Sequence, residues 1–135
     1  MSAERLGPYT LVLPDGCFPL GEDSLALGDF APVKPGARVC DLGCGGGTLL
    51  LLLARREPSL VLTGVELDEL SARAAGDNLA RNRLAGEIVI GDLREKGLLL
   101  SDSGHTQGYS HPSRATVLLF FPSPPCKPFH SVSSS

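Results

Sequence analysis

Residues 38–47 read RVCDLGCGGG, and this stretch decides the fold of the 135-residue chain. Arg38 to Leu42 is a short β-type run that predicts a strand. Thr48 to Arg56 is rich in leucine and predicts a helix. Between them, Asp41-x-Gly43-x-Gly45-x-Gly47 forms a glycine-rich turn from strand to helix. Glycine permits positive φ and a close approach of the backbone, and the start of a helix offers unpaired N–H groups, so this turn is a candidate ligand-binding loop.

The same unit repeats along the next forty-five residues. Leu60 to Glu66 predicts a second strand, Asp68 caps a helix through about Leu84 that Gly86 terminates, and Glu87 to Asp92 predicts a third strand. Strand and helix alternate, which predicts an α/β fold: a Rossmann-like, partial doubly wound parallel sheet of three or four strands with flanking helices. Right-handed crossovers would then bring the acids that close the strands, Asp41, Glu66 and Asp92, to one carboxyl edge of the sheet.

Composition divides the chain near residue 100. Residues 1–100 have the balanced mixture of a folded domain, whereas residues 101–135 hold nine of the thirteen serines, all three histidines and a single acid, Asp102. This Ser/Pro-rich tail is typical of a disordered terminus. A truncation or disturbed reading frame near residue 100 explains the change equally well, and both interpretations stay open. Residues 115–121 are apolar enough to form a fourth strand.

Charge and cysteine usage limit the class of protein. The net charge of −3 argues against a protein that binds nucleic acid through its overall positive charge. Binding through a local basic patch is still compatible with the sequence. The cysteines Cys17, Cys40, Cys44 and Cys126 form no C-x-x-C pair and have no histidine at ligand spacing, so we expect no metal site. No signal peptide or membrane-spanning run is recognisable, and the expected location is the reducing cytoplasm.

Three kinds of nucleotide site compete for the glycine-rich turn. A dinucleotide fingerprint starting at Gly43 and Gly45 would place its third glycine at Thr48, and a phosphate-binding P-loop would need a lysine after Gly47; both are absent. Asp41, just before the glycines, would repel a pyrophosphate but could hold the ammonium group, or an ordered water, of a methionine head group. The residues therefore favour a sulfonium nucleoside.

At this point the sequence resembles a known family. Val39 to Gly47 is similar to motif I of class I S-adenosylmethionine-dependent methyltransferases, Gly64 to Asp68 to their second motif, and Gly91-Asp92-Leu93 to their adenine-flanking motif. Residues 75–84 resemble the helix after the second motif. Phe18 to Leu27 resembles a segment of the small-domain branch that contains bacterial adenine-N6 methyltransferases of valine tRNA. The resemblance covers about residues 9–95.

The resemblance implies S-adenosylmethionine as cofactor and N-methylation of adenine in tRNA as the reaction. It implies that Asp41 anchors the amino-acid head, that Glu66 accepts hydrogen bonds from the ribose hydroxyls, and that Asp92 accepts one from the adenine amino group. The cofactor-binding set that follows is Asp41, Gly43, Gly45, Gly47, Glu66, Leu67, Asp92 and Leu93.

The sequence departs from that branch where the catalytic motif belongs. The branch has Asn-Pro-Pro-aromatic after its fourth strand, whereas this chain has Phe121-Pro122-Ser123-Pro124-Pro125-Cys126. Ser123 lacks the amide that would orient a target amine, and Cys126 cannot stack on a base. Catalytic residues are therefore left unassigned. The alternative function is a truncated, non-catalytic cofactor-binding fragment that needs a partner, or a second copy of itself, to complete the sheet.

Overall fold

The structure is a computed structural model that describes residues 1–17, 21–92 and 116–120. The described elements, in chain order, are β1 (Ser2–Leu6), β2 (Tyr9–Leu13), α1 (Glu22–Phe30), β3 (Arg38–Leu42), α2 (Thr48–Arg56), β4 (Val61–Glu66), α3 (Glu69–Arg81), β5 (Gly86–Ile90) and β6 (Thr116–Phe120). Of the segments discussed above, residues 18–20, 93–115 and 121–135 lie outside the described residues.

The centre of the fold is a parallel sheet with the strand order β5-β4-β3-β6. The run β3-α2-β4-α3-β5 builds the sheet in one direction, and β6 then pairs on the other side of β3. This reversal is the switch point at which doubly wound sheets bind their ligands, beyond the carboxyl ends of the strands. The predicted fold class is confirmed, and the apolar run at 115–121 does contain a strand.

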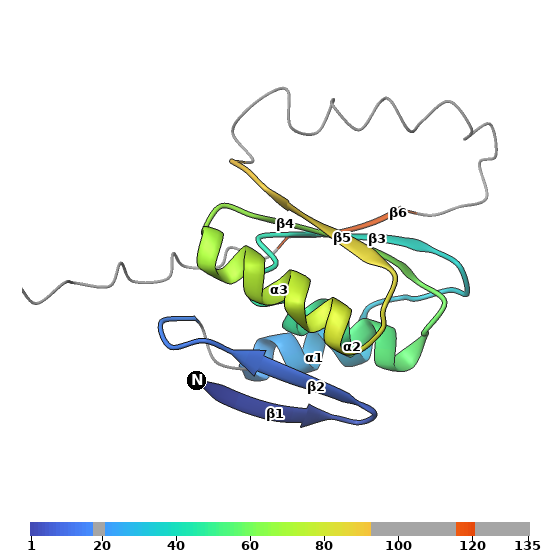
Figure 1. Cartoon of the computed structure of the whole chain (residues 1–135). Helices are drawn as coiled ribbons and strands as arrows, with labels where there is room; N and C mark the ends of the chain where they lie inside the picture. The colour runs from blue at the N-terminus through green and yellow to red at the C-terminus, as the bar shows by residue number, and fades with distance from the viewer. Residues whose placement is uncertain (18–20, 93–115, 121–135) are drawn as a thin grey trace, which may run out of the picture.

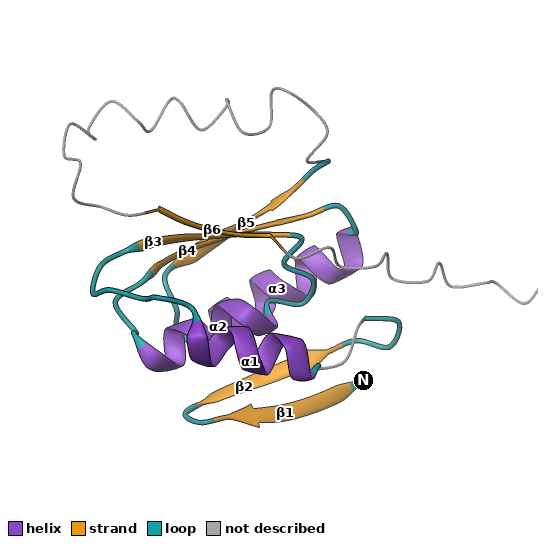
Figure 2. Ribbon diagram, turned by 180° about the vertical axis from the view of Figure 1, so that it is seen from behind, coloured by secondary structure: helices purple, strands orange, loops and turns teal. Residues whose placement is uncertain are grey.

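The described helices lie on one face of the sheet, and the β1–β2 hairpin lies beyond them (Figures 1 and 2). This sandwich explains the leucine run of α2. Leu49 to Ala54 are all buried, because α2 contacts α1 and the hairpin and shares one apolar core with Val39 and Leu62 of the sheet. A helix that is apolar all round is stable only when it is covered all round.

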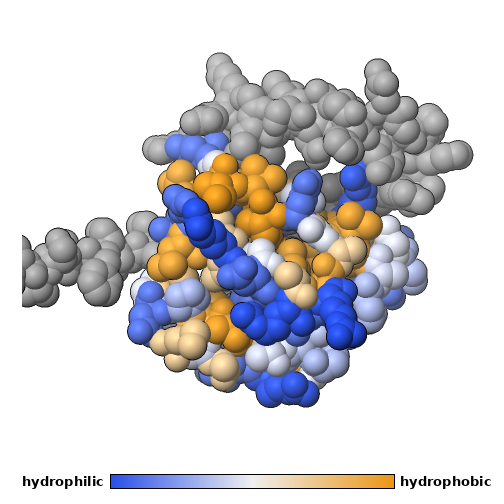
Figure 3. Space-filling model, viewed as in Figure 1, coloured by the Kyte–Doolittle hydropathy of each residue, from blue (hydrophilic) through white to orange (hydrophobic). Residues whose placement is uncertain are grey.

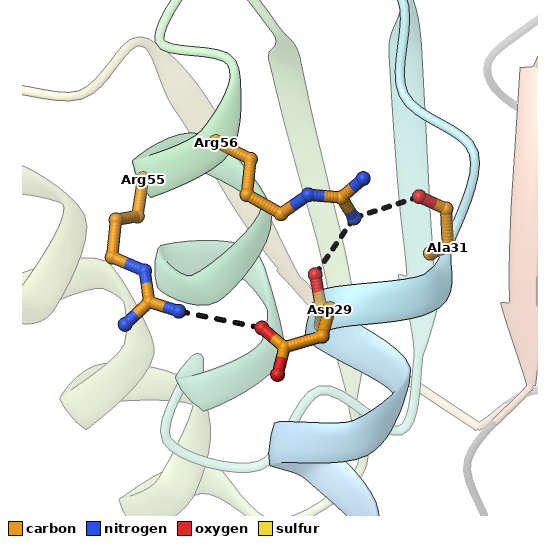
Figure 4. A network of polar contacts seen from close by, with 5 residues as sticks. Asp29, Ala31, Arg55 and Arg56 are labelled. Atoms are coloured by element: carbon orange, nitrogen blue, oxygen red, sulfur yellow. Dashed lines mark hydrogen bonds and ion pairs between the residues drawn. The ribbon is translucent and has the colours of Figure 1, made fainter.

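Helix α1 is fastened to α2 at a close crossing. A Cβ on Gly28 would lie 2.8 Å from Leu52 Cβ, so only glycine lets the helices approach this far. Arg56 Nη1 donates to the carbonyl oxygens of Gly28 and Ala31, at 2.8 and 2.7 Å, and thereby caps the C-terminus of α1 with a positive charge (Figure 4). Arg55 and Asp29 form a longer, exposed ion pair beside this cap.

The turn between α3 and β5 differs from the sequence prediction. Helix α3 begins after Asp68, whose side chain accepts from the Ser71 N–H at 2.9 Å as predicted, but it ends at Arg81 rather than near Leu84. Arg83 adopts φ 55°, a left-handed conformation that stops the helix. Gly86 does not terminate the helix; it opens β5, where a Cβ would lie 2.6 Å from the Leu62 carbonyl oxygen. Close strand contact, not helix capping, requires this glycine.

Candidate cofactor site

The glycine-rich turn has the backbone that its sequence predicts. Gly43, Gly45 and Gly47 all have positive φ, at 81°, 54° and 88°, and α2 begins directly after Gly47. The turn is closed by hydrogen bonds from the Gly43 and Cys44 N–H groups to the Val65 carbonyl, at 2.7 and 3.0 Å. Residues with side chains rarely adopt this conformation, so the glycines are needed for the path of the loop itself.

Asp41 occupies the end of β3 directly below this turn. Its side chain is only 1% exposed, and its Oδ1 atom is buried without a hydrogen-bond partner among the described residues. Burial, and secondarily the Glu66 carboxylate, raise the pKa of Asp41 to about 7. A buried, unpartnered carboxylate oxygen is costly and rare in a folded protein, so this atom is poised to receive a donor from a ligand.

Glu66 lies at the end of the adjacent strand β4 and is held in place by backbone groups. Its Oε2 accepts from the Gly45 N–H at 2.8 Å, and its Oε1 accepts from the Asp68 N–H at 3.1 Å. Each carboxylate oxygen has a second lone pair, so both can still accept a ligand hydroxyl. Glu66 therefore links the glycine-rich turn to the start of α3 and keeps a fixed orientation.

The third predicted acid, Asp92, lies two residues beyond the end of β5 and is half-buried. The Gly91 N–H donates to the Glu66 carbonyl at 3.0 Å, which holds the start of this loop beside the end of β4. The structure thus brings Asp41, Glu66 and Asp92 to one carboxyl edge, as the repeating pattern predicts. Leu93, the last of the predicted residues, lies outside the described residues.

Apolar side chains border the same edge of the sheet. Leu67, Leu70 and Ile90 are 61%, 47% and 52% exposed, and they come from the end of β4, the first turn of α3 and the end of β5. Figure 3 shows apolar side chains gathered on this part of the surface, above the hydrophilic side of α3. Exposed apolar groups beside buried acids suit a ligand that has both a flat ring and polar groups.

Cys44, which lies in the glycine-rich turn, carries an unreactive thiol. Cys44 is buried, and burial, followed by the charges of Asp41 and Glu66, raises the pKa of its thiol far above the ordinary value. It therefore stays a neutral thiol that fills space against Gly64. In the described part of the chain, no three His, Cys, Asp or Glu side chains gather as a metal site would require.

Sequence reasoning missed the hairpin and its role beside the site. A Cβ on Gly46 would lie 2.3 Å from Leu13 Cδ2, so β2 packs directly against the glycine-rich turn. The signal was present: Gly7-Pro8 is a turn dipeptide between two short runs, the second of which alternates buried Leu11 and Leu13 with half-buried Val12.

Comparison with known proteins identifies the family. The sequence profile of the family described as "Methyltransferase small domain" matches residues 24–98, which is more than half of the chain. The chain belongs to this family. The matched range contains the whole glycine-rich turn. It also contains Asp41 and Glu66, at the ends of β3 and β4, and Asp92, which follows β5.

Among sequence relatives of this chain, a protein of Dickeya chrysanthemi is 38% identical over 94 residues, which cover 65% of this chain and 37% of the relative. One of Cronobacter sakazakii is 40% identical over 72 residues, which cover 53% of this chain and 29% of the relative. Both are named tRNA1(Val) (adenine(37)-N6)-methyltransferase. The chain thus spans about a third of the length of these relatives.

Solved structures agree on the fold. A SAM-dependent methyltransferase of Thiobacillus denitrificans, solved in complex with S-adenosyl-L-homocysteine, is 26% identical with a TM-score of 0.52, over 76% of this chain and 37% of that one. A tRNA (uracil-54, C5)-methyltransferase of Pyrococcus abyssi has a TM-score of 0.59 at 21% identity, over 72% of this chain and 25% of that one, and it supports the fold alone.

Across residues 1–17, 21–92 and 116–120, none of the helices is both long and apolar enough to cross a membrane.

Proposed function

We propose that this small-domain methyltransferase binds S-adenosylmethionine at the carboxyl edge of its sheet and methylates an adenine nitrogen in tRNA. The observation that carries the proposal is the buried Asp41 Oδ1, which has no hydrogen-bond partner among the described residues and lies beside Glu66, next to a glycine-rich turn that leads into a helix. The names of the sequence relatives support adenine in tRNA as the substrate class. The proposal takes residues 1–100 as the N-terminal part of the cofactor-binding domain and residues 101–135 as a Ser/Pro-rich tail that contributes the strand β6, and it places the protein in the cytoplasm.

Each predicted site residue has a task in this proposal. Asp41 receives the ammonium group of the methionine head or a water bound to it, because its Oδ1 has no donor among the described residues. Glu66 receives the ribose hydroxyls, since its oxygens are already oriented by the Gly45 and Asp68 N–H groups. The turn formed by Gly43, Gly45 and Gly47 surrounds the methionine part.

The adenine end of the cofactor would lie between apolar and acidic residues. Leu67, exposed directly after Glu66, offers an apolar surface to the ring, and Asp92 accepts a hydrogen bond from the exocyclic amino group. Leu93 is proposed to flank the ring as in the family motif. When bound, the cofactor supplies an electrophilic methyl group on a sulfonium. The protein then has mainly to position the acceptor nitrogen, because sulfonium is an excellent leaving group.

Calorimetry with S-adenosylhomocysteine tests the cofactor site. Glu66→Ala should weaken binding about tenfold or more, the loss expected when hydrogen bonds to a charged group are removed. Glu87→Ala is the matched control, because Glu87 lies exposed on the neighbouring strand β5 and should leave the affinity unchanged. Equal affinities of Glu66→Ala and the unchanged protein would refute the ribose-binding role.

A second candidate function is cofactor binding without methyl transfer, with a partner or second copy that completes the sheet. Ser123 and Cys126 favour it, because they stand where the adenine-N6 branch has Asn and an aromatic residue. Incubation with labelled S-adenosylmethionine and bulk tRNA separates the two functions. Label in adenine supports the enzyme; cofactor binding without label in tRNA supports the second candidate, and sedimentation of the same sample reports its association state.

A further inference from the structure

Asn78 of α3 and Asn82, the residue that directly follows this helix, hold the N-terminal hairpin through its backbone groups. The Asn82 side chain accepts from the Thr10 N–H and donates to the Thr10 carbonyl, both at 2.8 Å. The Asn78 side chain does the same with Val12, accepting from its N–H and donating to its carbonyl, both at 2.9 Å. Each amide thus acts as the missing neighbour strand for one residue of β2.

The spacing of the two elements makes this ladder possible. Residues four apart on a helix are separated by about 6 Å along its axis, and residues two apart on a strand by about 6.7 Å. In an antiparallel hairpin, alternate residues direct their N–H and C=O groups away from the partner strand. Thr10 and Val12 are two apart in β2, so both can present these groups to α3.

Asn78 does more than its neighbour, because it also reaches the glycine-rich turn. Its Nδ2 donates to the Gly46 carbonyl at 2.8 Å, in addition to the Val12 carbonyl, while Arg81 Nη1 donates to its Oδ1 at 2.6 Å. The side chain is fully buried, and all four of its hydrogen-bonding positions are filled. One amide therefore joins the hairpin, α3 and the turn.

Packing holds the turn from the same side. Leu13 of β2 occupies the space where a side chain on Gly46 would lie, and a Cβ on Gly47 would come within 3.3 Å of the Ala75 backbone of α3. The face of the turn that carries Gly46 and Gly47 is thus fixed by protein. Glu66 contacts the turn at Gly45, next to Asp41, whose Oδ1 has no hydrogen-bond partner among the described residues.

We propose that Asn78 is a positioning residue for the cofactor site: it fixes the glycine-rich turn against the N-terminal hairpin, which makes the hairpin part of the scaffold of that site. The inference rests on the proposed function for its affinity readout. Asn82, which holds the same strand without reaching the turn, is the matched control within the chain.

The test compares Asn78→Asp with Asn82→Asp in the full chain. Each substitution keeps the side-chain shape and removes two donated hydrogen bonds, but only Asn78→Asp releases the Gly46 carbonyl. We expect the affinity for S-adenosylhomocysteine to fall about tenfold or more in Asn78→Asp and less than about threefold in Asn82→Asp, after correction for the folded fraction. Equal losses in the two variants would overturn the proposal.

A second pair of variants covers the case in which Asn78→Asp does not fold. Leu13→Ala removes the hairpin side chain that packs on Gly46, whereas Leu11→Ala opens a cavity in the same strand within the common core. The folded fraction of Leu13→Ala should bind S-adenosylhomocysteine several-fold more weakly, and that of Leu11→Ala should bind as the unchanged protein does. The reverse order would contradict the proposal.

Amide hydrogen exchange of residues 43–47, measured without cofactor, separates this inference from the proposed function. Faster exchange in Asn78→Asp and Leu13→Ala than in their controls supports the positioning role even if the unchanged protein binds no cofactor, in which case only the proposed function fails. Exchange rates that are the same within both pairs would refute the positioning role whether or not the cofactor binds.

Discussion

Replacement of Asp41 by asparagine should change how the stability of the ligand-free protein depends on pH. The pKa of Asp41 is raised from 3.8 to about 7, chiefly by burial. Below pH 3.8 the carboxyl is protonated in both the folded and the unfolded chain. As the pH rises from 3.8 to 7, the unfolded chain loses this proton while the folded chain keeps it, so the free energy of unfolding falls; above pH 7 the loss is constant.

The size of the change in the free energy of unfolding depends on the pH range over which it is measured. Between about pH 5 and pH 7, each pH unit costs up to about 1.4 kcal/mol, so Asp41 should lower the free energy of unfolding by about 2 kcal/mol. The asparagine side chain of the Asp41→Asn variant does not ionise. Its buried amide brings its own cost of about 1–3 kcal/mol for unsatisfied hydrogen bonds, but that cost is the same at both pH values and cancels from the comparison.

Urea unfolding at about pH 5 and pH 8 measures the effect. The stability of the unchanged protein should fall relative to Asp41→Asn by about 2–3 kcal/mol between the two pH values, with the same urea dependence. Asp77→Asn, which alters an exposed acid of α3, should follow the unchanged protein. Parallel pH profiles of Asp41→Asn and the unchanged protein would refute the claim that a buried carboxyl group with a raised pKa lies at the end of β3.

Three further predictions follow from the same structure. The affinity for S-adenosylmethionine should rise up to about tenfold from about pH 6 to pH 8, because the cationic head group binds the ionised form of Asp41. Calorimetry in two buffers should show that binding releases a proton, and an affinity that does not change with pH would contradict this prediction. Gly86→Ala should destabilise by about 2 kcal/mol or more, because its Cβ meets the Leu62 carbonyl, whereas Gly76→Ala, with open space on α3, should stabilise by up to about 1 kcal/mol in urea unfolding. Arg83→Gly should raise the thermal midpoint slightly, because glycine adopts the left-handed conformation of this turn without strain; a lower midpoint would mean that the arginine side chain makes a stabilising contact.

The sequence predicted the parts of the fold that local patterns determine. The strand Arg38–Leu42 and the helix Thr48–Arg56 appear with the expected bounds, and Asp68 caps α3, because turn residues and apolar periodicity act over a few positions. The end of α3 could not be predicted as well. It depends on the left-handed Arg83, a conformation that side chains rarely adopt and that sequence patterns therefore do not indicate.

The hairpin and its attachment depend on contacts between distant residues. Strand β1 is exposed at four of its five positions, so its sequence carries little periodic signal. Strand β2 is held by Asn78 and Asn82, which lie 66 and 72 residues further along the chain than the residues they bind. The sequence showed these asparagines as part of a family-like helix, but only the structure shows that their side chains replace a strand.

The carboxyl edge of the sheet concentrates features that a protein selected for stability alone would not keep. Asp41 is buried without a donor to its Oδ1 among the described residues, next to the like charge of Glu66, and Leu67 and Ile90 are exposed beside them. Each feature costs stability in the ligand-free protein, and a cationic, ring-bearing ligand would remove all of them together. The opposite side of the glycine-rich turn is, by contrast, closely packed and fully hydrogen-bonded through Asn78. The turn therefore has one side that protein contacts hold in place and another side with polar and apolar groups that a ligand could cover. A preorganised binding loop requires both, because the fixed side keeps the loop in its binding conformation before the ligand arrives.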